Sequence, residues 1–416
     1  MGPQVNRVVV TGAGVVSPLG NDPETFFEAL AAGRSGIRKL EVPWAASLSR
    51  PYAGVVEADV ETGFPKIKRI GLDRVSMLAL LAARQAVAHA AIEFAGALGE
   101  ATGVYWATGM GGAATLEAAY HDLLVARAPR LKPTTIVLAM NNAATGQIAI
   151  EMGIHGPSLT YSSACSSSAV AIGEAYRAIR FGVVRAALAG GAEALLTEGV
   201  IKAWESLGTL ATVNPERPES GCRPFAADRS GFVLGEGAAA LVLEEESAAR
   251  LRGAAILGEI TGYGNTTDAT HITQPDVNGQ VRAMRQALAE ARLAPHDVDH
   301  INAHGTGTRA GDVIETRAIK EVFGAHAPYI PISATKALHG HLMGATGALE
   351  LIAALQALRR GVAPPTAHLW QPDPECDLDY VPLKARPLPR AAVAMSNSFG
   401  FGGNNAVLVL RRYTGA

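Results

Sequence analysis

The sequence predicts an α/β fold made of two similar halves. Short apolar segments alternate with helical patterns along the chain, and glycine-rich turns close many of these predicted strands. A strand with closely spaced glycines opens the chain, and the same pattern recurs at residues 255–264. A repeated opening of this kind indicates an internal duplication. We therefore expect two halves, residues 1–252 and residues 253–416, that pack as one unit.

The composition limits the classes of function. With 48% hydrophobic and 18% charged residues among 416, the chain can bury a large core, so disorder is not expected. The net charge of −2 provides no overall basic field, so nucleic-acid binding is not indicated. No apolar run is long enough to cross a membrane, and residues 1–10 lack the features of a signal peptide.

The cysteines stand far apart, at Cys165, Cys222 and Cys376. This spacing contains no CxxC pair, which argues against a disulfide framework and against a zinc site built from cysteines. Free thiols are typical of a reducing compartment, so we expect a cytoplasmic protein.

The first predicted elements are a strand at residues 8–10 and a helix that starts at Pro23. Asp22 is a typical capping residue, and proline is favoured in the first turn of a helix. Between them, Gly12 and Gly14 predict a turn that is similar to a dinucleotide-binding motif, although Ser17 stands where the third glycine belongs. A nicotinamide-dependent oxidoreductase is therefore an alternative that depends on two glycines.

Cys165 is the first candidate catalytic residue. It lies between a short predicted strand after Pro157 and a helical pattern that ends near Gly182. The positive end of the helix dipole should lower the pKa of the thiol and favour the thiolate. The plainer alternative is an inert buried cysteine among small residues.

Two histidines occupy similar positions in the second half. His304 follows a strand predicted at residues 298–303, and His341 lies in the loop after a strand predicted at residues 329–333. A glycine-rich loop at residues 396–405 follows a third strand. Sites in α/β folds form where strands end, and a cysteine with distant histidines is typical of a nucleophile assembled by folding.

Lys336 and Glu350 stand on either side of His341 in the sequence. Glu350 lies in an otherwise apolar helical pattern, where an unpaired buried carboxylate would be costly, so it needs a partner or a place on the helix surface. His339 and His341 could bind zinc together with His304, but no further ligand stands at a familiar spacing, and we interpret His339 as non-catalytic.

Six segments of the chain resemble the β-ketoacyl-[acyl-carrier-protein] synthases, in particular synthase II and the type II polyketide ketosynthases. The segments are VVVTGAGVVSPLG, SSACSSS, RPFAADRSGFVLGEGA, HGTGTRAGDVIE, SATKALHGHLMGATGALE and SNSFGFGGNN. The resemblance implies the thiolase fold, in which two α/β halves form five αβαβα layers. It also implies that the glycines near the N-terminus are structural.

The resemblance implies a decarboxylative Claisen condensation of an acyl chain with malonyl-carrier protein, in fatty acid elongation or in polyketide or polyene synthesis. Cys165 would be the acyl-bearing nucleophile. His304 and His341 would bind the malonyl thioester carbonyl, and Lys336 and Glu350 would support them. No cofactor is implied, because the substrates travel on the phosphopantetheine of the carrier protein.

Further roles follow from the same resemblance. The backbone N–H groups of Cys165 and Phe401 would form the oxyanion hole. Thr306 and Thr308 would contact the pantetheine arm. The implied gate and acyl-tunnel residues are Met110, Gly400, Phe401 and Gly402. A monovalent cation, bound in some relatives, would lie at Asn302, Glu350, Ser396 and Asn397.

The implied partner is an acidic acyl carrier protein, together with a second synthase chain. The residues matched to carrier-protein docking are Lys66, Lys68, Arg69, Arg130 and Lys132. A homodimer is the first expectation, and a heterodimer with a homologue similar to a chain-length factor is the alternative.

The chain departs from the family pattern outside the catalytic positions, at Ser163, Ala226, Ser230, Arg309 and Asn404. These departures leave the acyl chain length and the starter open. Two further classes of function also stay open, although each is disfavoured. A non-catalytic partner subunit would not need Cys165, and a thiolase-fold acyltransferase without decarboxylation would not need both His304 and His341.

Overall fold

The computed structural model describes residues 5–415, and its main feature is one continuous ten-stranded sheet. The strands run in the order β11-β10-β14-β15-β9-β1-β8-β6-β4-β5. Two small sheets, β12-β13 and β2-β3-β7, lie outside it. The strands are β1 (Val8–Val16), β2 (Ile37–Lys39), β3 (Tyr52–Gly54), β4 (Thr102–Ala107), β5 (Ser158–Tyr161), β6 (Ala186–Glu193), β7 (Leu234–Gly235), β8 (Gly237–Glu245), β9 (Gly258–Thr267), β10 (His300–Asn302), β11 (Ile332–Ser333), β12 (Val362–Ala363), β13 (Arg386–Pro387), β14 (Val393–Gly400) and β15 (Asn404–Arg411).

Helices cover the sheet and fill the space between its two halves. They are α1 (Pro23–Ala31), α2 (Lys66–Arg69), α3 (Arg74–Ala90), α4 (Ala97–Glu100), α5 (Ala113–Leu124), α6 (Thr135–Ala139), α7 (Ala143–Met152), α8 (Ser167–Arg180), α9 (Glu198–Leu207), α10 (Glu246–Leu251), α11 (Val277–Ala291), α12 (Arg309–Phe323), α13 (Lys336–His339) and α14 (Thr346–Arg360). Short 3₁₀ helices span Pro43–Ser47, Val60–Gly63, Pro218–Ser220, Pro295–Asp297, Gly324–Tyr329 and Met343–Ala345.

The two halves of the sheet repeat one topology. In the first half the order is β1-β8-β6-β4-β5, and in the second it is β9-β15-β14-β10-β11. In both halves the first two pairings are antiparallel and the last two are parallel. The halves join through antiparallel pairing of β1 with β9, in which Val8 faces Ile260. The predicted duplication is therefore confirmed, whereas the boundary between residues 252 and 253 stays a prediction.

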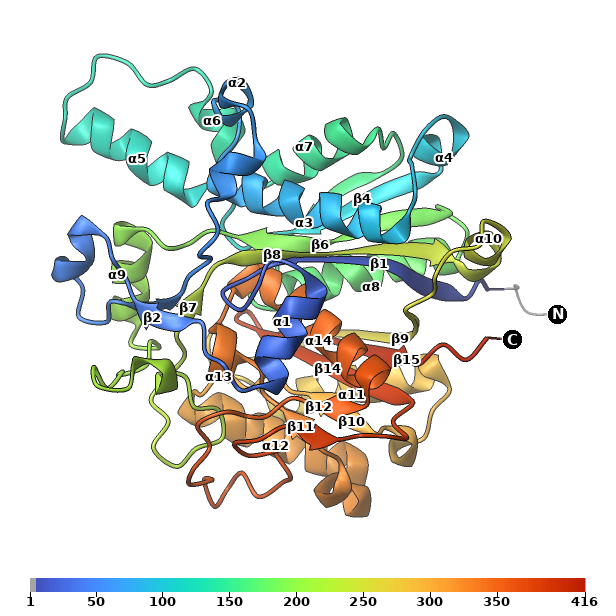
Figure 1. The fold of residues 1–416 in the computed structure, drawn as a ribbon. Coiled ribbons are helices and arrows are strands. Elements are labelled where there is room, and N and C mark those ends of the chain that lie inside the picture. Colours follow the sequence, from blue (N-terminus) through green and yellow to red (C-terminus); the bar gives the residue numbers. More distant parts are fainter. Residues whose placement is uncertain (1–4, 416) are drawn as a thin grey trace.

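The molecule has five layers, as Figure 1 shows. Helices α3 and α7 cover the outer face of the first half-sheet, and α11 and α12 cover the outer face of the second. Helices α8 and α14 lie between the half-sheets. The predicted five-layer αβαβα arrangement is confirmed: one cluster of buried apolar side chains lies under each outer helical layer, and a third lies on both sides of the central helices.

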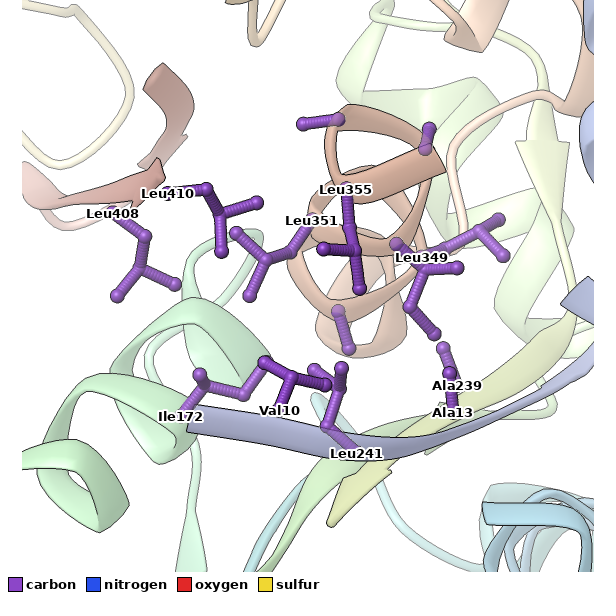
Figure 2. Packing of buried hydrophobic residues seen from close by; sticks show 14 of the residues in the cluster. Val10, Ala13, Ile172, Ala239, Leu241, Leu349, Leu351, Leu355, Leu408 and Leu410 are labelled. Carbon is purple, nitrogen blue, oxygen red and sulfur yellow. The ribbon is translucent and has the colours of Figure 1, made fainter. Parts of the chain in front are cut away.

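The central layer shows why α14 is apolar on nearly every side. Its leucines contact the strands of both half-sheets and helix α8 (Figure 2). Such a helix is hydrophobic all round because residues 346–358 are buried, and only Arg359 and Arg360 at its end meet water. The residues labelled in this cluster are Val10, Ala13, Ile172, Ala239, Leu241, Leu349, Leu351, Leu355, Leu408 and Leu410.

The glycines of the predicted dinucleotide turn lie inside strand β1. A Cβ atom on Gly12 would come within 2.1 Å of the Ala86 carbonyl oxygen on α3. Gly262 in β9 repeats this contact, since its Cβ would lie 2.2 Å from the Ala287 oxygen on α11. The predicted turn at Gly12 is therefore wrong, because the pair of glycines lets a helix pack directly on the strand. The oxidoreductase alternative loses its only support.

The other predicted elements differ from the structure mainly at their ends. Helix α1 begins as predicted, since the Asp22 side chain accepts hydrogen bonds from the backbone N–H groups of Glu24 and Thr25. The glycine-rich segment at residues 396–405 is less open than predicted. Strands β14 and β15 extend into it, so that only residues 401–403 connect them.

Candidate active site

Cys165 lies in the tight connection between β5 and α8. Ala164, the residue before it, has a φ of +52°, a conformation that costs energy for a residue with a side chain. Serine hydroxyls fix the connection: Ser167 Oγ accepts from the backbone N–H of Ser163 at 2.9 Å and donates to the Ala164 carbonyl at 2.6 Å. The small residues around Cys165 therefore serve to hold this turn, and they place the thiol at the wall of a cavity.

The thiol of Cys165 is not acidified as the sequence predicts. Burial raises its pKa to about 11, and this effect outweighs the opposing influence of Lys336 and of the backbone N–H groups of Phe401 and Cys165. A helix N-terminus alone would lower the pKa of the thiol, but the cost of removing a thiolate from water is larger here. These two N–H groups, which are the ones predicted for the oxyanion hole, nevertheless act to lower the pKa of the thiol.

His304 is held from two sides at the end of β10. Its backbone N–H donates to Glu315 Oε1 at 2.8 Å, and Lys336 donates to its carbonyl oxygen. The Lys336 ammonium also lies 3.4 Å from Nδ1 of the ring. Since an ammonium can only donate, Nδ1 accepts and the ring proton is assigned to Nε2.

His341 has the same tautomer for a different reason. The backbone N–H of Met343 donates to its Nδ1 at 3.2 Å, and the Thr346 hydroxyl lies 2.9 Å from the same atom. A backbone N–H cannot accept, so the ring proton again belongs on Nε2. Within residues 5–415, this buried Nε2 has no hydrogen-bond partner. A buried donor without a partner is costly unless a ligand supplies the acceptor.

The three side chains meet in one place. Donor atoms of Cys165, His304 and His341 all lie within 4.8 Å of one another. Burial, followed by the charge of Lys336, holds the pKa of both histidines well below the ordinary value. Both rings are therefore neutral near pH 7 and can donate from Nε2. His339 stays outside this group, because its ring nitrogens contact the Gly340 carbonyl and the Thr335 hydroxyl.

Lys336 and Glu350 form a fully buried ion pair behind the histidines. The Lys336 Nζ atom lies 2.7 Å from Glu350 Oε1, and both side chains are 0% exposed. Burial raises the pKa of Glu350 to about 7, against the effect of Lys336. The buried Glu350 carboxylate therefore has a charged partner, as one of the two alternatives predicted. The other alternative, a place for Glu350 on the helix surface, is wrong.

The cavity that Cys165, His304 and His341 line has a volume of about 280 Å³. Phe401 lies at its wall and stacks on Trp204, with ring centroids 6.1 Å apart. Gly400 must lack a side chain, because a Cβ there would lie 2.8 Å from the Ser163 carbonyl oxygen. Thr306 and Thr308 also line the cavity, and their hydroxyl oxygens lie 2.9 Å apart.

Two known protein-family domains match most of this chain. Residues 5–249 match the N-terminal domain of β-ketoacyl synthases, and residues 257–370 match the C-terminal domain. This chain belongs to the β-ketoacyl synthase family. The predicted family, fold and enzyme class are thereby confirmed: the synthase is an acyltransferase of the 3-oxoacyl-[acyl-carrier-protein] synthase type.

Two curated relatives align with the synthase over nearly its whole length. The 3-oxoacyl-[acyl-carrier-protein] synthase 2 of Staphylococcus aureus (strain N315) is 40% identical over 413 residues, which is 99% of each chain. Nodulation protein E of Rhizobium meliloti (strain 1021) is 43% identical over 406 residues, which is 98% of the synthase and 99% of that protein.

Two solved structures resemble the synthase closely. One is a ketosynthase chain in complex with its type II polyketide acyl-carrier protein and bound to a hexaketide. It has a TM-score of 0.90 and 31% identity, with 99% of the synthase and 100% of that chain covered. The other is the ishigamide ketosynthase/chain length factor, with a TM-score of 0.89 and 34% identity over 98% and 100% of the chains. Relatives thus bind a carrier protein or a chain-length factor.

Met110 lies outside the Cys165 cavity. It is 47% exposed and lines a separate open groove of about 610 Å³ between α5 and α9. Trp204 and Leu207 line both the groove and the cavity, so these side chains stand between the two spaces. Trp204 could not be predicted from the sequence, because a tryptophan on an amphipathic helix has no motif of its own.

The residues matched to a cation site contain buried oxygens that lack partners. Within the described chain, Asn302 Oδ1, Glu350 Oε2 and Asn397 Oδ1 are buried and make no hydrogen bond. Ser396 pairs with Asn302 across β10 and β14, and Asn302 also lowers the pKa of Glu350 from close by. Carboxylate and amide oxygens are ligands that hard cations prefer, so this donor set fits a cation.

The five residues matched to carrier-protein docking lie at the surface, but two of them already form ion pairs within the chain. Lys68 pairs with Glu151, and Arg69 lies 3.2 Å from Glu61. Lys66, Arg130 and Lys132 are exposed. Their docking role stays a prediction. No helix within residues 5–415 is long and apolar enough to cross a membrane.

Proposed function

We propose that the synthase condenses an acyl chain held on Cys165 with a malonyl group delivered by an acyl carrier protein. The observation that carries this proposal is the meeting of Cys165, His304 and His341 within 4.8 Å, around an unpartnered Nε2 donor. A thiol near two neutral N–H donors suits a reaction that needs a nucleophile first and an enolate later.

The first half-reaction is acyl transfer. The Cys165 sulfur, as thiolate, attacks the acyl thioester carbonyl, and the carrier thiol leaves with the proton. The backbone N–H groups of Cys165 and Phe401 would stabilise the oxyanion of the tetrahedral intermediate. Both groups act to lower the pKa of the Cys165 thiol, which is the influence expected of N–H donors aimed at this atom.

The second half-reaction uses the histidines. Nε2 of His304 and Nε2 of His341 would donate to the malonyl thioester oxygen while the C–C bond to the carboxylate breaks and CO2 leaves. The resulting enolate carbon then attacks the acyl-Cys165 carbonyl. The C–S bond breaks, the Cys165 thiolate is released, and the product is a 3-oxoacyl thioester. Thr306 and Thr308 would bind the pantetheine arm at the cavity wall.

A monovalent cation would bind at Asn302, Glu350, Ser396 and Asn397. Its charge would satisfy the unpartnered oxygens of Asn302, Asn397 and Glu350. It would also counter the burial that raises the pKa of Glu350, so that Glu350 stays ionised beside Lys336. The cation would thus stabilise the ion pair that supports His304.

A second synthase chain would bind along β5. This strand forms one end of the large sheet and pairs only with β4 among the described strands. Large apolar side chains are exposed on β5 itself, at Leu159, and on α7, which packs against it, at Ile150. An open strand edge beside exposed apolar residues is typical of an interface between chains. The occupant would be a second copy or a homologue similar to a chain-length factor.

The direct test is a condensation assay with the purified protein. We expect acyl- and malonyl-carrier proteins to yield equal amounts of 3-oxoacyl-carrier protein and CO2, with an acyl adduct on the protein in intact-mass spectra. A series of acyl donors then separates elongation of fatty acids from polyketide or polyene synthesis. Failure to release CO2 with any carrier-bound malonyl group would contradict the proposal.

Trp204 would set the length of the accepted acyl chain. It separates the Cys165 cavity from the outer groove, so Trp204→Ala should join the two spaces. Each buried methylene contributes about 0.8 kcal/mol, so two more buried methylenes should raise kcat/KM for long donors roughly tenfold relative to short ones. Trp44→Ala is the matched control, because Trp44 lines neither space. An unchanged donor preference would exclude this role.

A further inference from the structure

Glu193 is a buried carboxylate that the mechanism does not use. It ends strand β6 and is 0% exposed. Its Oε2 atom accepts from the backbone N–H groups of Gly109 at 2.7 Å and Gly344 at 2.9 Å. Its Oε1 atom accepts from the Thr108 hydroxyl at 3.1 Å and from the Met110 N–H at 3.3 Å.

These donors belong to two loops that are remote in sequence. Residues 108–110 follow β4 and lead into the groove lined by Met110. Gly344 belongs to the 3₁₀ turn that follows His341. A single carboxylate oxygen, Oε2, therefore joins the loop beside the groove to the loop that carries His341.

Only glycine fits at Gly109 and Gly344, where the two loops meet beside Glu193. A Cβ on Gly344 would lie 2.5 Å from the Gly109 nitrogen and 2.8 Å from Glu193 Oε2. A Cβ on Gly109 would lie 2.7 Å from the same oxygen. Since both contacts are closer than carbon atoms can approach, any side chain would displace a backbone N–H from the carboxylate.

The carboxylate is required in its ionised form. Thr108 Oγ1 accepts from the Gly111 N–H, so its own proton is directed to Glu193. Among residues 5–415, every hydrogen-bond partner of Glu193 is then a donor, and none of them could accept a proton from a carboxylic acid. Burial raises the pKa of Glu193, while the backbone N–H groups oppose that effect.

The contact with Gly344 lies one residue from the group that orients His341. Met343, which directly precedes Gly344, has a φ of +42°, and its N–H donates to Nδ1 of His341. A methionine leaves this conformation readily unless its neighbours hold it. Glu193 provides that hold on the C-terminal side.

We propose that Glu193 is a positioning residue for condensation: by holding Gly344, it keeps the Met343 N–H on Nδ1 of His341 and so directs the Nε2 proton into the cavity. The inference rests on the proposed function. It assigns Glu193 to the second half-reaction, because the Gly344 contact holds the turn that orients His341. Glu193 reaches Cys165 only through its charge, which raises the pKa of the thiol, so its removal should not slow acyl transfer.

The test separates the two half-reactions in Glu193→Gln. A glutamine keeps the shape but turns one oxygen into an NH2 group that opposes the backbone donors. We expect acyl transfer to Cys165 to stay within about threefold of wild type. Single-turnover condensation from preacylated protein should fall about 10- to 100-fold in kcat with little change in KM for malonyl-carrier protein.

Glu244→Gln is the matched control, since Glu244 on β8 is also a buried carboxylate, but it pairs with Arg252 after α10. Equal losses in both half-reactions, or a loss no larger than that of Glu244→Gln, would overturn the proposal. If Glu193→Gln does not fold, Gly344→Ala tests the same contact from the other loop, with the same outcomes. Absence of CO2 release by the wild-type protein would instead refute the proposed function.

Discussion

Cys165→Ala should abolish condensation while leaving decarboxylation of malonyl-carrier protein intact. The substitution removes the only sulfur among the described residues that line the cavity, so no acyl adduct can form, and we expect at least a thousandfold loss of product. It leaves the tautomers of His304 and His341 unchanged, since those depend on Lys336 and Met343. Intact mass and CO2 release measure the two outcomes separately.

The wild-type protein and Cys165→Ala should also differ in pH dependence, since only the wild-type reaction requires the Cys165 thiolate. Because burial raises the pKa of Cys165 to about 11, only about one thiol in ten thousand is ionised at pH 7 in the free enzyme. The rate of acyl transfer in wild type should therefore rise between pH 7 and pH 9, whereas decarboxylation by Cys165→Ala should not. Cys222→Ala, which removes a buried cysteine outside the cavity lining, should retain the adduct. Condensation by Cys165→Ala would refute its role as nucleophile.

The residues that meet in the cavity could be predicted because each follows the end of a strand. His304 and His341 follow the neighbouring parallel strands β10 and β11, whose carboxyl ends lie at one edge, whereas Cys165 follows β5 in the other half of the sheet. The sequence pattern therefore predicts the chemistry of these residues and the place of each within its own half. Their meeting depends on how the two halves pack.

Other features depend on distances that no local pattern contains. Glu193 contacts residues 84 and 151 positions away. Gly12 lacks a side chain because of α3, which begins 62 positions later at Arg74. The pKa of Cys165 depends on how completely other segments cover it. A local motif predicts a turn at Gly12 and an acidic thiol at Cys165, and burial by distant elements reverses both predictions.

His304→Ala and His341→Ala should each leave acyl transfer intact and reduce condensation from preacylated protein by about 10²- to 10³-fold, the usual loss for one donor to a developing oxyanion. Neither ring is required to stabilise the acyl-transfer oxyanion, for which the N–H groups of Cys165 and Phe401 are available. Matched substitutions to asparagine keep a neutral N–H donor, so they should recover part of the lost rate. Single-turnover measurements separate the two half-reactions.

The protonation state of His304 and His341 predicts the pH profile of condensation. An ordinary histidine with a pKa of 6.5 would be about three-quarters protonated at pH 6. Burial and the Lys336 ammonium hold the pKa of both rings well below that value, so both stay neutral as the pH falls from 8 to 6. Condensation from preacylated protein should thus be nearly constant over this range. A loss of rate centred near pH 6.5, which His341→Asn abolishes, would mean that a ring titrates normally and would contradict its assignment as a neutral donor.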